Sequence, residues 1–382
     1  MYRRLADPDS TIGTDPRSDP RMVAALAPLA LDGRYPQPAL TVDAPLEKRR
    51  AFVAEIEENT GAVLDMFAQS VPIFEGVTTT TTTIEGTDGN DVTLYISRPD
   101  AGDGALPCVV HLHGGAMAFL SAADIGYMRG REYLAATGLV VVGVEFRNSA
   151  GKLGPHPYPA GLNDCATGVR WTYANRSDLG VSHLIVGGES GGGNLTLAVT
   201  HKAKREGWLH EIAGVYAQCP FISNRWLEQP DDLPSLREND EYFISCLGLA
   251  LMGSIYNPDG SHSHDATCWP LEATDAELSG IRMAQTSGDS SPAAAIDMPT
   301  PLYSAEIRKL RRTMRTVRRA NSNVSASRAT CPASMMTSLA GVKAPTFSTT
   351  AIPTSLCFKA PASFKPSPTM VTVRPRACSD FT

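Results

Sequence analysis

Ser190 is the residue whose sequence surroundings point most directly to chemistry. It lies at the centre of G-E-S-G-G, residues 188–192, which has the form G-x-S-x-G. The apolar run 184–187 before it predicts a short buried strand, and residues 195–204 carry apolar side chains at helical spacing. A G-x-S-x-G sequence at a strand-to-helix junction is typical of a nucleophile elbow, in which the serine attacks a carbonyl carbon. A glycine-rich turn with a purely structural serine is the simpler alternative.

A second glycine-rich sequence, HLHGG at residues 111–115, ends about 75 residues before Ser190 and follows an apolar run. Two adjacent glycines let backbone amides approach a ligand closely, as an oxyanion hole requires. The alternative is a tight turn after a strand, in which His113 only packs. Because a candidate elbow follows downstream, we favour the oxyanion hole.

The elements that would position these residues follow a regular order. A helix is expected from Asp43, as its N-cap, to about residue 69, and the threonine-rich stretch 77–86 predicts a strand or edge strand. From residue 91 onward, apolar strands alternate with helices, a pattern that predicts a parallel sheet with helices on both faces. The expected strands are 92–99, 107–115, 138–147, 184–187 and 212–221, and the expected helices are 124–137, 160–176 and 195–204. Residues 224–256 interrupt this order and predict an insertion over the end of the sheet.

Composition excludes several classes of protein. The 382 residues have a formal net charge of −6, which gives no reason to expect a nucleic-acid partner. The eight cysteines are scattered without a C-x-x-C pair, so we expect free thiols in a reducing compartment and no zinc site. The polar start lacks a signal-peptide pattern, and the longest near-apolar run, residues 244–255, is too short to span a bilayer. A cytoplasmic location is expected.

Three motifs in this sequence, HLHGGAMAF, HPYPAGLNDC and GGESGGGNL, resemble in order and spacing the hormone-sensitive-lipase-like branch of the α/β-hydrolases. The resemblance covers roughly residues 40–280. Ala116 stands at the third glycine of the family's HGGG loop, and E-S-G replaces the family's D-S-A. The resemblance implies an α/β-hydrolase core at residues 76–281, with a mostly parallel sheet flanked by helices. It also implies N-terminal cap helices in residues 1–75 and a cap insertion at about 224–256.

The same resemblance implies a carboxylic-ester hydrolase that forms an acyl-enzyme. Ser190 would be the nucleophile, and the amides of Gly114, Gly115 and Gly191 would hold the oxyanion. The expected partner is a small acyl-ester substrate, without a metal or an organic cofactor. No nucleic-acid partner and no membrane span are expected. The sequence does not determine the oligomeric state, and a dimer is one of the alternatives.

The acid and the base of the family's catalytic triad are not recognisable in this chain. The family order is Ser, then Asp or Glu, then His, but no histidine follows His264. Asp289, in TSGDSSP, is the candidate acid, lying a few residues before the expected place. No catalytic histidine is found: His262 and His264 are expected in a solvated loop, and His201 on the exposed side of its helix. Losing the base predicts a badly impaired enzyme.

The last hundred residues differ in composition from the rest. Residues 282–382 hold 14 Lys or Arg against 4 Asp or Glu, whereas residues 1–281 hold 20 against 36. Such a Ser-, Thr-, Pro- and Arg-rich tail predicts disorder. A frameshifted or mis-spliced reading is the favoured explanation; a genuine disordered basic extension and a divergent active site are the others. In a genuine extension, the arginine-rich cluster 308–319 would bind acidic partners.

A binding function is the alternative to hydrolysis. Plant gibberellin receptors resemble the same family, lack the catalytic histidine and use the site to bind a small molecule under a lid. A catalytically dead member that binds a small molecule in the retained pocket would also fit the missing histidine. Against this alternative, a receptor should keep the last strands of its sheet, for which this sequence shows no counterpart.

Overall fold

The computed structural model describes residues 10–16, 18–69, 71–101, 104–231, 233–281 and 283–286. The region expected to be a basic tail, 282–382, lies outside the described residues except for a short strand at 283–286. Asp289 and the arginine-rich cluster 308–319 also lie outside them. The expected disorder of this tail and its explanations therefore stay predictions.

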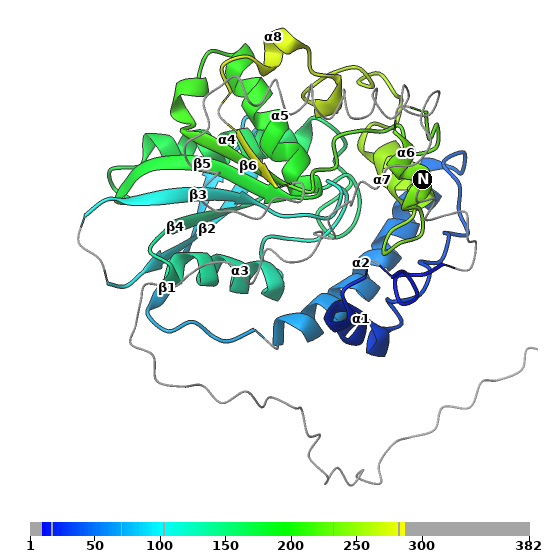
Figure 1. Ribbon diagram of the computed structural model, residues 1–382. Helices are drawn as coiled ribbons and strands as arrows, with labels where there is room; N and C mark the ends of the chain where they lie inside the picture. The colour runs from blue at the N-terminus through cyan, green and yellow to red at the C-terminus, as the bar shows by residue number, and fades with distance from the viewer. Residues whose placement is uncertain are drawn as a thin grey trace, which may run out of the picture. The chain divides into compact units, whose positions relative to one another are not determined.

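A seven-stranded sheet forms the centre of the described chain (Figure 1). Its strands are β1 (Val77–Glu85), β2 (Asp91–Pro99), β3 (Leu106–Leu112), β4 (Val140–Glu145), β5 (Val181–Glu189), β6 (Gly214–Gln218) and β7 (Met283–Thr286). Their order across the sheet is β1-β2-β4-β3-β5-β6-β7. The β1–β2 and β2–β4 pairs are antiparallel, and every later pair is parallel. The mostly parallel sheet expected from the sequence is confirmed.

Burial along the strands follows their place in the sheet. Strand β4 is buried from Val140 to Val144, because it lies inside the sheet with both faces covered. Strand β1 lies at the edge, and the threonines 78–81 are exposed there. The threonine run is thus the edge strand that its composition predicts, since β-branched polar side chains suit a strand open to water.

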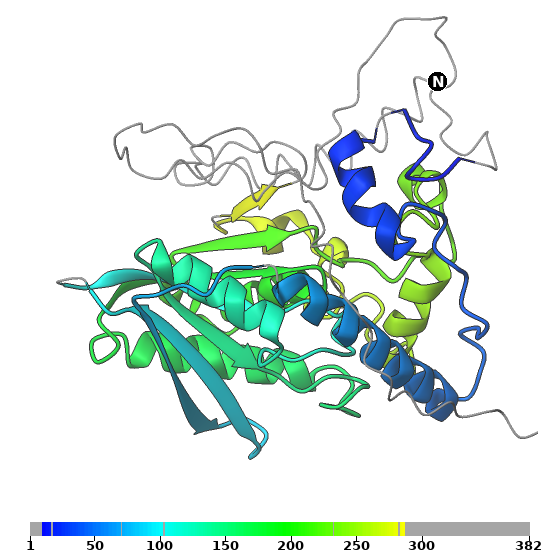
Figure 2. The same ribbon diagram turned by 90° about the horizontal axis from the view of Figure 1, so that it is seen from below.

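Helices cover both faces of the sheet, as Figures 1 and 2 show. Helix α3 (Ile125–Ala136) lies on one face, and helices α4 (Ala160–Ala174) and α5 (Gly191–Arg205) lie side by side on the other. Shorter elements complete the described chain: the 3₁₀ turns Ala27–Leu29, Leu209–Glu211 and Pro270–Glu272, and the single-turn helix α8 (Asp275–Leu278). The two-faced covering expected from the strand–helix alternation is confirmed.

A group of helices lies beyond one end of the sheet (Figure 2). It comprises α1 (Pro20–Leu26), α2 (Leu46–Gln69), α6 (Pro234–Glu238) and α7 (Cys246–Tyr256). Helix α2 begins three residues after Asp43, so Asp43 is not the N-cap that the sequence suggested. The N-terminal segment contacts the 224–256 insertion, since the Tyr35 amide donates to the Glu241 carbonyl oxygen at 2.7 Å. Their assignment as a cap stays a prediction.

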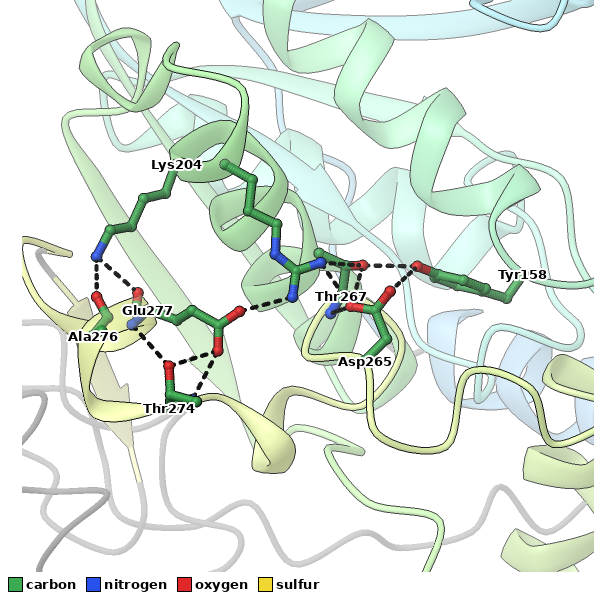
Figure 3. A network of polar contacts seen from close by, with 8 residues as sticks. Tyr158, Lys204, Asp265, Thr267, Thr274, Ala276 and Glu277 are labelled. Atoms are coloured by element: carbon green, nitrogen blue, oxygen red, sulfur yellow. Dashed lines mark hydrogen bonds and ion pairs between the residues drawn. The ribbon is translucent and has the colours of Figure 1, made fainter.

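The segment after α7 returns to the C-terminal half of α5 and is tied to it by charges (Figure 3). Arg205 donates through one guanidinium nitrogen to Asp265 at 2.7 Å and through the other to Glu277 at 2.8 Å. Lys204 donates to the carbonyl oxygen of Ala276 at 2.5 Å. Tyr158 lies on the far side of the network and donates to Asp265 at 3.2 Å. We call these contacts the α5 brace.

Candidate active site

Ser190 lies where strand β5 ends and helix α5 begins, and its backbone is strained. Its φ of 54° and ψ of −115° lie outside the regions that a residue with a side chain ordinarily adopts. The Ser190 amide donates to the Gln218 carbonyl oxygen at 2.9 Å, and the Ser190 carbonyl accepts the Asn194 amide at 3.0 Å. Such strain persists only where surrounding contacts hold it, which is typical of functional sites. The predicted strand–turn–helix arrangement around Ser190 is confirmed.

The glycines two residues before and after Ser190 have no room for a side chain. A Cβ on either Gly188 or Gly192 would overlap the carbonyl oxygen of Leu112, the last residue of β3. A Cβ on Gly192 would also lie 2.5 Å from the carbonyl oxygen of His113. Because these two glycines carry no side chain, the backbone at the end of β3 can pack directly against the backbone of the elbow.

The chain after β3 turns directly across the start of α5. We call residues 113–120 the HGG loop. Three successive residues of this loop, Gly115, Ala116 and Met117, have φ values of 94°, 54° and 57°. A Cβ on Gly191 would lie 2.6 Å from the amide nitrogens of both Ala116 and Met117. The amides of the loop therefore lie against the first residue of helix α5, beside Ser190.

The amides of this region differ in whether they already have an acceptor. The Gly114 amide donates to Glu189 Oε1 at 2.8 Å and lies 3.1 Å from the Tyr127 hydroxyl oxygen. The amides of Gly115, Ala116 and Gly191 donate to no acceptor among the residues that the structure describes. Gly114 is thus engaged, and the sequence reasoning missed the amides of Ala116 and Met117, which also donate to no acceptor among the described residues. The residue type gave no signal, because every amino acid except proline has a backbone N–H.

The Glu189 side chain fixes the start of the HGG loop by a hydrogen bond. Its Oε2 atom lies 3.3 Å from His111 Nε2, while its Oε1 atom accepts the Gly114 amide. Burial raises the pKa of Glu189, but the hydrogen bond and charge of His111 outweigh burial and bring the pKa below its ordinary value. Burial and the Glu189 charge raise the pKa of Tyr127 well above its ordinary range. A fixed carboxylate therefore anchors the loop to the residue before Ser190.

His113, in the HLHGG sequence before the HGG loop amides, is a buried packing residue. Its Nδ1 atom lies 2.8 Å from the Gly114 carbonyl oxygen, and its ring stacks on Phe146 with centroids 4.0 Å apart. Burial lowers the pKa of His113 to about 4, so the ring is neutral at pH 7. The packing alternative considered for His113 matches these contacts.

None of the other described histidines hydrogen-bonds to Ser190. His201 was expected on the exposed side of its helix, but that expectation is wrong: its exposure is 1%. Helix α5 lies between the sheet and the brace segment, so the polar His201 is covered although Arg205 at the helix end stays exposed. His264 is 93% exposed near Glu272, and His262 lies against the Tyr158 ring. The Ser190 hydroxyl has no hydrogen-bond partner among the described residues.

The part of the chain that the structure describes lacks both a metal-binding cluster and a membrane-spanning helix. No cluster of three or more His, Cys, Asp or Glu side chains in this part of the chain could hold a metal ion. No helix within it is long and apolar enough to cross a bilayer.

Glu57 is a residue near the site that the sequence reasoning missed. It is buried, and its carboxylate accepts the Leu120 amide at the end of the HGG loop at 2.7 Å. The sequence did hold a signal: Glu57 lies four residues after Val53 and directly after Ile56, inside the apolar stripe of helix α2. A charged residue in an apolar stripe needs a buried partner.

The comparisons with known proteins agree with this architecture. A family model described as the α/β-hydrolase fold matches residues 109–287. The structure of brefeldin A esterase, a bacterial homologue of human hormone-sensitive lipase, is 38% identical with a TM-score of 0.72. The match covers 81% of this chain and 86% of that chain.

Curated relatives match over shorter segments. A carboxylesterase of Mycobacterium tuberculosis is 33% identical over 126 residues, 32% of this chain and 38% of the relative. A gibberellin receptor of Arabidopsis thaliana is 24% identical over 200 residues, 51% of this chain and 53% of the receptor. This chain thus spans about two fifths to one half of these curated relatives. The elbow, the HGG loop, the sheet order and these likenesses together show that the chain belongs to the α/β-hydrolase family, in its hormone-sensitive-lipase-like esterase branch.

Proposed function

We propose that this chain is a carboxylic-ester hydrolase whose nucleophile is Ser190. The observation that carries the proposal is the strained Ser190 backbone beside three amides without acceptors, those of Gly115, Ala116 and Gly191. An oxyanion hole is such a set of preorganised donors beside a nucleophile. The family membership supports ester chemistry, because both the carboxylesterase and the brefeldin A esterase are described as esterases.

The proposed reaction has two steps. The Ser190 Oγ atom bonds to the acyl carbon, and the carbonyl oxygen becomes an oxyanion that the three amides hold. The oxyanion collapses, the carbon–oxygen bond to the alcohol breaks, and an acyl-enzyme remains. Water then attacks the acyl-enzyme, releasing the acid and restoring Ser190. The positive N-terminal end of α5 adds to the stabilisation of the oxyanion.

The proton of the Ser190 hydroxyl limits the rate in this proposal. No described histidine accepts it, and no histidine follows His264. The proton must therefore pass to solvent, and we expect turnover several orders of magnitude below that of an intact triad. Asp289 stays the predicted acid, but without a histidine it has no base to orient. Aryl esters should react best, because their leaving group departs without being protonated.

Release of p-nitrophenol from p-nitrophenyl butyrate tests the proposal. We expect slow release by the full chain that is lost in Ser190→Ala and kept in Ser182→Ala, whose serine is exposed on strand β5. A fluorophosphonate probe should label Ser190 in the full chain and in Ser182→Ala. Equal release and labelling by Ser190→Ala would refute Ser190 as the nucleophile.

Binding without turnover is the second candidate function. The missing downstream histidine favours it, together with the likeness to a gibberellin receptor. Calorimetry with a non-hydrolysable ketone analogue of the ester separates the two functions. Saturable binding with no Ser190-dependent release supports binding alone, whereas Ser190-dependent release supports hydrolysis.

Resequencing the transcript from about codon 270 tests why the triad is incomplete. A second reading frame that encodes an acidic motif followed by a histidine would make the natural protein an ordinary esterase. A confirmed frame would leave the triad incomplete. The cytoplasmic location and the oligomeric state stay predictions.

A further inference from the structure

Helix α2 packs directly against the HGG loop, although the two are about 60 residues apart in the sequence. Val53 on the helix is fully buried in a small apolar cluster with Ala118, Phe119 and Leu120 of the loop. Ala150, from the segment after β4, and Ile255 of helix α7 belong to the same cluster. One face of α2 is therefore part of the environment of the loop whose amides lie beside Ser190.

The Glu57 carboxylate extends this contact from apolar packing to directed hydrogen bonds. Its Oε1 atom accepts the Leu120 amide at 2.7 Å, and its Oε2 atom accepts the Lys152 amide at 2.7 Å. Glu57 lies one helical turn after Val53, so both side chains point the same way. Gly151 has a φ of 61°, and a Cβ there would overlap Glu57 Oε2. The segment after β4 therefore has a residue without a side chain where it contacts this carboxylate.

The loop is held on its other side by backbone bonds from the same segment. The Ser149 amide donates to the Met117 carbonyl oxygen at 2.9 Å, and the Ala150 amide donates to that of Ala118 at 3.0 Å. The Asn148 side chain donates to the Leu120 carbonyl oxygen at 2.7 Å. Glu57 thus bonds to both partners of this contact, the loop and the segment that supports it.

We propose that Glu57 is a positioning residue that couples helix α2 to the oxyanion donors of the HGG loop. The proposal rests on the proposed function, because it assigns a catalytic use to the Gly115 and Ala116 amides. Leu120, with a φ of 72°, is a further left-handed residue at the end of the loop, three residues after Met117, the last of the successive left-handed residues that orient these amides. A displacement of α2 would release the Leu120 and Lys152 amides together and let the loop relax. Misplacement of such donors by about 1 Å costs on the order of a hundredfold in rate.

A carboxylate suits this place better than a neutral side chain of the same shape. Two backbone amides need two acceptor atoms, and hydrogen bonds to a charged acceptor are the stronger kind. In Glu57→Gln the side chain keeps one acceptor and turns an amide group towards the other N–H. The matched control is Glu58→Gln, which makes the same change at the next residue on the exposed side of α2.

Two measurements on the full-length variants test the coupling. The first is hydrogen exchange in peptides covering residues 114–121 and 148–153. The second is the rate at which a fluorophosphonate labels Ser190. In Glu57→Gln we expect faster exchange in both peptides and labelling slowed at least about tenfold. The labelled end-point and the half-saturating probe concentration should stay unchanged, which a mere loss of folded protein would not give. Glu58→Gln should match the unmodified chain in both.

The outcomes separate this proposal from the proposed function. Unchanged exchange and labelling in a folded Glu57→Gln would overturn the coupling. If the unmodified chain takes up no probe at Ser190, the proposed function fails, and exchange still decides whether Glu57 holds the loop. If Glu57→Gln does not fold, exchange in the unmodified chain decides: the Leu120 and Lys152 amides should open together with α2. Opening at unrelated rates would overturn the coupling.

Discussion

The two ends of helix α5 are held in different ways. At its start, Gly191 and Gly192 lie against the backbone of β3 and the HGG loop, with no space for another carbon atom. At its end, Lys204 and Arg205 reach outward to the segment 265–279 through the α5 brace (Figure 3). The start is held by close backbone contact, and the end by charges on long side chains.

Because the two ends are held differently, we expect the free energy of unfolding to respond to different changes at each end. Close-packed backbone has nowhere to move, so added volume at the start of α5 must displace the strand or the loop. Half-exposed ion pairs contribute less, and they respond to pH and salt. The buried His201 lies between the two ends, and we expect it to lower the stability of the fold only in acid.

Gly192→Ala should have the largest effect. The added methyl group would overlap the Leu112 carbonyl oxygen and crowd that of His113, both of them backbone atoms. We expect a loss of about 4 kcal/mol or more in the free energy of unfolding. Urea unfolding followed by circular dichroism measures it. A loss below about 1 kcal/mol would show that the start of α5 can move, and would contradict the claim that close backbone contact fixes it.

His201→Leu should change the response to acid. Burial lowers the pKa of His201 to about 4, and both ring nitrogens lack a partner among the described residues. The unfolded state therefore binds a proton more readily, and stability falls as pH drops from about 6.5 to 4. This group accounts for roughly 3 kcal/mol of that loss, and the leucine variant should lack it.

Urea unfolding at pH 7, 5 and 4 checks this pH dependence. His264→Gln, at a histidine whose side chain is 93% exposed, is the control and should follow the unmodified chain. A leucine variant with the same loss between pH 7 and 4 would contradict the assignment to His201.

Arg205→Ala should cost about 1 kcal/mol at pH 7, because its ion pairs are partly exposed. Burial raises the pKa of Asp265, but hydrogen bonds from Thr267 and Arg205 outweigh it and lower the pKa to about 2. For Glu277, bonds from Thr274 and Arg205 likewise outweigh burial and lower the pKa to about 2. Folded pKa values below the unfolded ones mean stability that is present above about pH 4 and lost towards pH 2.

The cost of Arg205→Ala should therefore shrink as pH falls below 4, and also in 1 M NaCl. Urea midpoints at pH 7 in low and high salt, and at pH 3, measure this. Lys202→Ala, which removes only an exposed pair with Glu206, should cost less at every pH. An Arg205→Ala cost that is independent of both salt and pH would argue that packing, and not charge, holds this end.

Gly130→Ala should have the smallest effect and the opposite sign. Gly130 is exposed within helix α3, and a Cβ there would meet nothing within 4 Å. Alanine should stabilise the fold by about 0.5–1 kcal/mol. Gly168→Ala in helix α4 is the matched contrast, since its Cβ would lie 2.7 Å from Val144 Cγ2 and should destabilise. Thermal unfolding of both variants measures the pair.

Much of the fold followed from the sequence, because the signals were local. The valine run of β4, the threonine run of β1 and the strand–turn–helix around Ser190 depend on neighbouring residues and their periodicity. The family motifs placed Ser190 and the HGG loop in register. Helix α2 ends at Gln69, as predicted, but begins at Leu46 and not directly after Asp43. A helix start is harder to predict, because it depends on which of several terminal contacts form.

Several features of the candidate site could not be predicted in this way. His201 lies in a polar, basic stretch of sequence, yet the segment 265–279 folds back over α5 and buries it. The Gly114 amide was a plausible oxyanion donor until Glu189, 75 residues later, engaged it. In both cases the deciding contact comes from a distant part of the chain.

The order of the amino acids alone indicates that Ser190 stands at a tight turn between a strand and a helix, and that no histidine follows His264. Composition and local periodicity suffice for both, since neither depends on long-range packing. The packing of distant segments, in contrast, sets which amides are free beside Ser190 and brings Glu57 from helix α2 to the HGG loop. Hydrogen bonds between segments 60 or more residues apart depend on how strands and helices pack, and local sequence patterns carry no record of that packing.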